Sequence, residues 1–216
     1  EWLDEFRRHN DKRAARALYL AGRWLRVFQT LAFSNPDTER IGQNSPLDLV
    51  EYCNIRLNKL KSLGYRWVSI HRSRLVLQAV DALRRRSDSI DKRLVWSHGD
   101  YAHGNVLWDG VVLTPIDFSM ANPDVPLLDV TYFIHRLEML PVYFPWRRWP
   151  IQHWMRAFLR GYGRTDAEES PMYRALMIRH WLCRLQTYVR RPPKGIKQRI
   201  HNAWVRRCVR NQLMTE

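Results

Sequence analysis

The chain has 216 residues, 45% of them hydrophobic, and a formal net charge of +15. This length allows one sizeable hydrophobic core. No run approaches the roughly 18 to 20 consecutive apolar residues of a membrane span, and no signal peptide is visible. The three cysteines, Cys53, Cys183 and Cys208, are too scattered to suggest a disulfide framework or a zinc site. We therefore expect a cytoplasmic globular protein with reduced thiols.

Apolar residues at helical spacing dominate the first 92 residues. The pattern predicts a helix over residues 2–31, with arginines opposite its apolar stripe, and two further helices over 47–63 and 74–86. Gly64 is expected to end the second helix, and the Ser-Asp-Ser sequence at 87–89 to break the third. This part of the chain is therefore predicted to be a helical scaffold.

The most informative stretch follows a short predicted strand at 93–96. Asp100 comes directly after a Ser-His-Gly sequence, and Asn105 follows five positions later. Residues 106–116 then form a predicted hairpin across an Asp-Gly turn. The hairpin brings the chain back to Asp117, which we expect to lie beside Asn105.

These three polar residues are the types that phosphoryl transfer requires. A carboxylate must orient and deprotonate the acceptor hydroxyl, and oxygen ligands must hold Mg²⁺ against the phosphates of ATP. Asp100 suits the first task, while Asn105 and Asp117 suit the second. The competing interpretation is an ordinary hairpin turn flanked by solvated loop acids.

The order His-Gly-Asp, Asn, Ile-Asp-Phe and a further Asp resembles the aminoglycoside phosphotransferase and choline kinase superfamily. The resemblance implies that Asp100 is the catalytic base and that Asn105 and Asp117 are metal ligands. It also implies that Asp129, in the first turn of a helix, supports the catalytic loop. His98 either braces this loop through its ring nitrogens or takes part in the chemistry.

The resemblance implies a mostly α fold with a small β-hairpin, the C-terminal lobe of a protein-kinase-like α+β fold. No glycine-rich phosphate loop or strand lysine precedes residue 97, so the nucleotide-binding N-terminal lobe is expected elsewhere in the same protein. We divide residues 1–216 into a helical part (1–92), the catalytic loop with the metal-binding hairpin (93–118) and a helical acceptor-side part (119–216). The fragment alone is expected to bind ATP weakly.

The last part is predicted to be helical. A helix over 129–140 is expected to end at Pro141, and an aromatic and basic segment follows at 142–154. Its aromatic residues are either core or a surface for lipid or glycan. Two more helices are expected after residue 171, the last with an apolar face of Ile196, Ile200, Trp204 and Cys208 against a solvated basic side.

The positive charge bears on the acceptor. A site for polycationic aminoglycosides or choline would be expected to carry carboxylates or an aromatic cage, whereas this chain offers mainly arginine. A few acids such as Asp124 and Glu138 could still build a small cationic pocket. We expect a sugar, an amino alcohol or an envelope glycan or lipid as acceptor, with possible peripheral contact to the inner face of an anionic membrane.

Two other function classes remain open. A basic, aromatic-rich lobe can bind nucleic acid through phosphates and stacking, although no nucleic-acid motif is present and this partner is not favoured. A catalytically inactive kinase-like scaffold is the second alternative. Against it, Asp100, Asn105 and Asp117 are all residues that the chemistry needs.

Overall fold

The computed structural model describes residues 11–31 and 49–215 and is mostly helical. Its four β-strands are short and form two separate two-stranded antiparallel sheets. The helices are α2 (Asp11–Phe28), α3 (Leu49–Ser62), α4 (Ile70–Arg86), α5 (Leu127–Tyr143), α6 (Ile151–Tyr162), α7 (Pro171–Arg190) and α8 (Ile196–Thr215), and the strands are β1 (Val95–Ser97), β2 (Val106–Trp108), β3 (Leu113–Pro115) and β4 (Asn122–Asp124).

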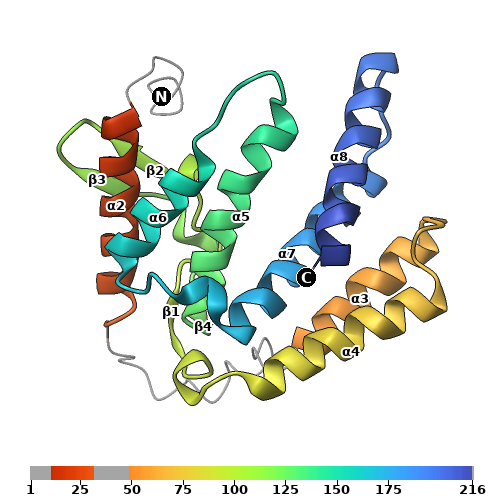
Figure 1. The fold of residues 1–216 in the computed structure, drawn as a ribbon, viewed down its shortest axis with the longest axis horizontal. Coiled ribbons are helices and arrows are strands. Elements are labelled where there is room, and N and C mark those ends of the chain that lie inside the picture. The colour runs from red at the N-terminus through yellow and green to blue at the C-terminus, as the bar shows by residue number, and fades with distance from the viewer. Residues whose placement is uncertain (1–10, 32–48, 216) are drawn as a thin grey trace.

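Helix α5 lies in the middle of the molecule (Figure 1). Helices α2 and α6 pack together on one side of it, and α7 packs on the other side. The α3–α4 pair and α8 both pack against α7. The core follows this arrangement, because Phe133 of α5 stacks on Phe158 of α6 with ring centroids 4.3 Å apart, while Trp181 of α7 is 1% exposed.

Two glycines allow α2 and α6 to approach until their backbones touch. A Cβ atom at Gly22 would overlap the carbonyl oxygen of Phe158, and a Cβ atom at Gly161 would overlap the carbonyl oxygen of Tyr19. The tyrosine at position 101 extends this contact, because its hydroxyl donates a hydrogen bond of 2.9 Å to the carbonyl oxygen of Ala21. Helix α2 is therefore fixed both to α6 and to the loop after β1.

The two sheets enclose the polar loop that the sequence singled out. Strand β1 pairs with β4, so Ser97 lies opposite Asn122. Strands β2 and β3 form the expected hairpin, in which Val106 pairs with Pro115. The Asp109 carboxylate closes the turn by accepting hydrogen bonds from the main-chain N–H groups of Val111 and Val112. The loop between β1 and β2 is thus held at both ends by strand pairing.

Several predicted boundaries need correction. Helix α4 begins at Ile70 rather than residue 74, because the Ser69 hydroxyl caps it by accepting from the Arg72 N–H. Helix α5 begins two residues earlier than expected and runs through Pro141 to Tyr143. A proline this close to the end of a helix removes only one late hydrogen bond, and the helix closes with Phe144 N–H donating to Leu140. Strand β4 was not anticipated.

The prediction of which face of helix α8 is buried was also wrong. Ile196 and Ile200 are 75% and 68% exposed, and the buried positions are instead Val205, Val209 and Leu213. Both sets recur every four residues, so spacing alone did not distinguish them. The expected positions 2–10 of the first helix and 47–48 of the second lie outside the described residues.

Within the described ranges, no helix is both long and apolar enough to cross a bilayer.

Candidate active site

The loop between β1 and β2 is anchored by a buried carboxylate. Asp129, in the first turn of α5, is completely buried, and its two oxygens accept main-chain hydrogen bonds from His98 (2.6 Å) and Gly99 (3.0 Å). Burial raises the pKa of Asp129 to about 6, although the hydrogen bonds from His98, Gly99 and Ser97 act in the opposite direction. The loop backbone is thus bound at two consecutive N–H groups.

Gly99 is required by this geometry. Its φ of 79° lies in the left-handed region, and a Cβ atom there would overlap the main chain of Met120. Glycine at position 99 therefore allows the main chain just before Asp100 to pass close to the main chain of Met120.

Asp100 and Asn105 are in direct contact. The Nδ2 group of Asn105 donates to both the main-chain oxygen (2.8 Å) and the carboxylate Oδ2 (2.9 Å) of Asp100. Because both partners are acceptors, the amide nitrogen must face them, and the amide oxygen of Asn105 is left available. The Asp100 carboxylate also lies near the hydroxyl of Tyr132, whose pKa is raised to about 12 by burial and by Asp100.

Asp117 follows strand β3, at the end of the hairpin. The neighbouring Ile116 N–H donates to the main-chain oxygen of Asn105 at 2.9 Å, which fixes the spacing between the two candidate ligands. Asp117 itself is exposed and has φ 64° and ψ 66°, a left-handed conformation that costs energy outside glycine. Its Oδ1 accepts from the Ser119 hydroxyl at 2.7 Å.

The residues fit a divalent cation. Asn105 and Asp117 supply an amide oxygen and a carboxylate, which are hard donors of the kind that Mg²⁺ prefers, and the exposed position of Asp117 leaves room for phosphate oxygens.

His98 connects the loop with the hairpin. Its side chain is fully buried, and its Nε2 lies 3.0 Å from the carbonyl oxygen of Ile116, to which it must therefore donate. The ring also packs against Phe118, with centroids 4.6 Å apart. These contacts hold the residues on either side of Asp117, and they leave no described contact between the His98 ring and Asp100.

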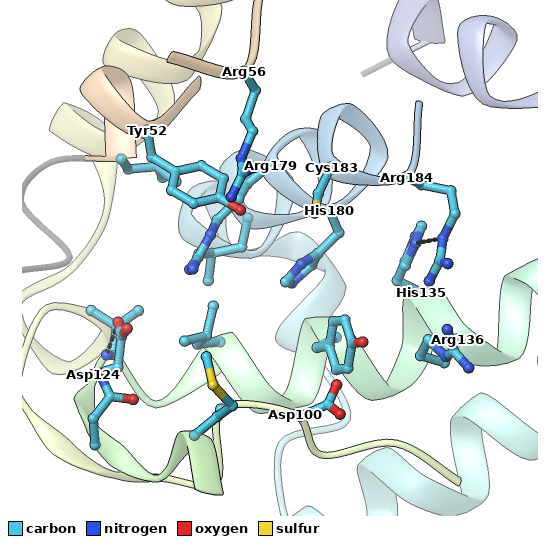
Figure 2. A pocket seen from close by; sticks show the side chains of 18 of the residues that line it. Tyr52, Arg56, Asp100, Asp124, His135, Arg136, Arg179, His180, Cys183 and Arg184 are labelled. Carbon is cyan, nitrogen blue, oxygen red and sulfur yellow. Dashed lines mark hydrogen bonds between the residues drawn. The ribbon is translucent and has the colours of Figure 1, made fainter. Parts of the chain in front are cut away.

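A cavity of about 620 Å³ opens beside Asp100 (Figure 2). Its walls come from the loop between β1 and β2, from β4 and from helices α3, α5 and α7. Four arginines line it together with three acids, Glu51, Asp100 and Asp124; the arginines are Arg56, Arg136, Arg179 and Arg184. The positive side chains therefore outnumber the negative ones around the space next to Asp100.

The two histidines of the cavity add no positive charge at neutral pH. Burial lowers the pKa of both His135 and His180 well below the ordinary value, and neighbouring cationic arginines act in the same direction. His135 also contacts Arg184, whose Nε lies 3.5 Å from its Nε2. Asp124 has its pKa raised by burial, with Arg179 acting against this rise.

The sequence singled out the loop residues as candidates, but it did not predict most of this cavity. The structure joins Asn105 to Asp100 by hydrogen bonds, and Asp129 to the main chain of His98 and Gly99, while Asp117 follows Ile116, whose N–H donates to the Asn105 carbonyl oxygen. The arginines of α3, α5 and α7 were not recognised as a group. The available signal was the absence of any Asp or Glu between residues 170 and 215, which left the arginines of that segment without local partners.

The comparisons with known proteins agree with this fold. The model of a phosphotransferase enzyme family matches residues 1–176. Among solved structures, a Plasmodium vivax ethanolamine kinase aligns at 11% identity with a TM-score of 0.60, covering 94% of this chain and 62% of its own. A choline/ethanolamine kinase family protein from Mesorhizobium loti aligns at 14% identity and 0.58, covering 97% and 65%.

A third structure, amicoumacin kinase hAmiN in complex with AMP-PNP, Ca²⁺ and Ami, aligns at 14% identity with a TM-score of 0.56, covering 93% of this chain and 59% of its own. This chain therefore spans about three fifths of the length of these neighbours. No curated protein matches significantly. The matching family model covers well over half of the residues, and the chain belongs to this phosphotransferase enzyme family.

Proposed function

We propose that this protein transfers the γ-phosphoryl group of ATP to a hydroxyl of a sugar, an amino alcohol or an envelope glycan or lipid. The observation that carries the proposal is the Asp100–Asn105 pair beside the cavity. The Asp100 carboxylate lines a space large enough for a small acceptor, while the Asn105 amide that donates to it keeps its oxygen available for a metal ion.

In this mechanism Asp100 orients the acceptor hydroxyl and receives its proton. Asn105 and Asp117 would hold Mg²⁺, which when bound neutralises charge on the phosphates. We assign Asp129 and His98 as positioning residues, because Asp129 binds the loop backbone and the His98 ring binds Ile116. Most of the acceleration would come from this fixed arrangement of reacting groups.

The described residues would form the C-terminal lobe of such an enzyme. Support comes from the exposed surface around Asp117, where Phe118 and Met120 are 42% and 62% exposed beside the candidate metal ligands. Bound nucleotide and an N-terminal lobe of the same protein would cover this surface. Residues 1–216 alone should therefore bind ATP weakly and turn over little.

The exposed face of α8 supports a further, separate hypothesis, contact with an anionic membrane. Ile196, Ile200 and Trp204 are exposed, with Lys197 and Arg199 on the same helix. A peripheral position on the inner face of the cytoplasmic membrane would follow. Co-sedimentation with phosphatidylglycerol vesicles at physiological salt tests it, and failure to bind removes the membrane contact without affecting the phosphotransferase proposal.

The test of the main proposal is phosphate transfer from γ-labelled ATP into a cell extract that is separated into aqueous and lipid fractions. The full-length gene product would be compared with Asp100→Asn and with Asp88→Asn, a matched change at an exposed loop carboxylate. Label that requires Asp100 but not Asp88 supports a phosphotransferase. Absence of Asp100-dependent label in both fractions favours the inactive scaffold or, with steeply salt-dependent binding of nucleic acid, the nucleic-acid alternative.

A further inference from the structure

We infer that the acceptor carries an anionic group, a phosphate or a carboxylate, in addition to the hydroxyl that receives the phosphoryl group. The site for this anion is formed by Arg56, Arg136, Arg179 and Arg184 in the cavity beside Asp100. The inference rests on the proposed function and specifies its substrate class. It excludes simple cations such as choline and ethanolamine as preferred acceptors.

Within the described part of the chain none of the four guanidinium groups is ion-paired with a carboxylate at 4.0 Å or less, although Arg179 interacts electrostatically with the cavity acid Asp124. Arg56 donates instead to the amide oxygen of Gln186 at 3.1 Å, and Arg184 contacts the neutral ring of His135. These contacts satisfy individual N–H groups of Arg56 and Arg184 but supply no negative charge.

The arginines form two pairs at different places in the cavity. Arg56 and Arg179 both stack on the ring of Tyr52, with their guanidinium carbons 4.6 Å and 4.5 Å from its centroid. Stacking on an aromatic ring holds the planar guanidinium and leaves its edge free for an oxyanion. Figure 2 shows both side chains reaching from α3 and α7 toward the same space.

The second pair lies nearer the proposed reaction centre. Arg136 and Arg184 are the cations that act electrostatically on Tyr132, the residue beside Asp100. Arg136 comes from α5 and Arg184 from α7, so their side chains approach the cavity from two different helices (Figure 2). An acceptor bound between the two pairs would have its anionic group on arginine and a hydroxyl within reach of Asp100.

Charge complementarity decides between acceptor classes. Arginines that line one cavity repel one another, and an oxyanion bound between them reduces this repulsion while accepting charge-assisted, bidentate hydrogen bonds. A quaternary ammonium or primary amine would add another positive charge to the cluster. Of the three acids of the cavity, Glu51 is exposed, Asp100 accepts from Asn105 and Asp124 accepts from the Val125 N–H, and the four arginines outnumber them.

Binding should be measured on the full-length gene product by calorimetry in EDTA without ATP, so that no metal–nucleotide complex contributes. The probes are inorganic phosphate and glucose 6-phosphate, with choline and ethanolamine as cationic controls. We expect both anions to bind more weakly as salt increases, and Arg179→Gln/Arg184→Gln to lose at least about tenfold in affinity. Arg174→Gln, an exposed arginine on the same helix, should leave affinity unchanged.

Some results would overturn the inference. They are the absence of anion binding up to about 10 mM, equal binding by the double variant, or tighter binding of choline or ethanolamine. The Asp100→Asn variant distinguishes the two proposals, because it should abolish transfer and keep the arginine-dependent anion binding. Transfer that depends on Asp100 but is insensitive to the arginine pair would refute the anion site alone. The labelled fraction then separates a free phosphorylated or acidic sugar from a lipid headgroup.

Discussion

Replacing Asp129 with asparagine tests the carboxylate that holds the loop between β1 and β2. In the folded protein burial raises its pKa from 3.8 to about 6, so the native state binds this proton more tightly than the unfolded chain. Stability from Asp129 is therefore complete below about pH 4 and is lost as the pH rises through about 6. The change corresponds to about 3 kcal/mol between these limits.

Asparagine cannot titrate, and it offers one oxygen where two N–H groups need acceptors. One of the His98 and Gly99 N–H groups should lose its partner, at a cost of about 1–3 kcal/mol. At high pH this cost is offset because the buried charge is gone. The variant should then be nearly as stable as the wild type, while phosphate transfer falls because the loop is held at a single point.

Urea unfolding between about pH 4 and about pH 8 measures the difference in unfolding free energy between wild type and Asp129→Asn. We expect this difference to shift by about 3 kcal/mol in favour of the variant as the pH rises. Asp88→Asn, at an exposed position, should give a curve parallel to the wild type. Parallel curves for Asp129→Asn would refute the argument that this carboxylate is buried at an energetic cost.

Three further substitutions test the packing and the strain in the structure. Asp117→Val should lower the unfolding free energy by about 1–2 kcal/mol although position 117 is exposed, because a β-branched residue fits the left-handed backbone poorly. Asp117→Asn should leave the stability in urea nearly unchanged and still abolish phosphate transfer. Asp91→Ala should cost about 2–3 kcal/mol in the same assay, since the buried Asp91 carboxylate binds both Arg164 and Ser170, and a loss below about 1 kcal/mol would contradict this. Gly161→Ala should lower the melting temperature by an amount equivalent to about 1–3 kcal/mol, whereas Ala substitution at the exposed Arg160 should have little effect.

The parts of the site that are close in sequence could be predicted from it. Asp100, Asn105 and Asp117 lie within one strand, loop and hairpin unit, so turn chemistry and residue spacing were enough to expect them together. Asp129 was assigned by resemblance, and its carboxylate accepts hydrogen bonds from the main-chain N–H groups of His98 and Gly99.

The cavity could not be predicted in this way. Arg56 meets Gln186 across a separation of 130 residues, and no local pattern specifies which face of α3 turns toward α7. Unpaired arginines on a helix normally indicate a solvated face, which is how the basic residues after position 171 were interpreted. For α8 the sequence pattern was ambiguous in another way, because two sets of apolar residues share a four-residue period and the wrong set was expected to be buried.

The contact between α2 and α6 has a consequence for protein engineering. Backbone atoms, rather than interlocking side chains, determine how far apart these two helices lie, because Gly22 and Gly161 each face the main chain of the other helix. A library could randomise exposed α2 positions such as Arg16 and Arg23 without changing that spacing. Selection at codons 22 and 161 should recover glycine alone, so these two positions would reveal whether a redesigned sequence still builds the same scaffold.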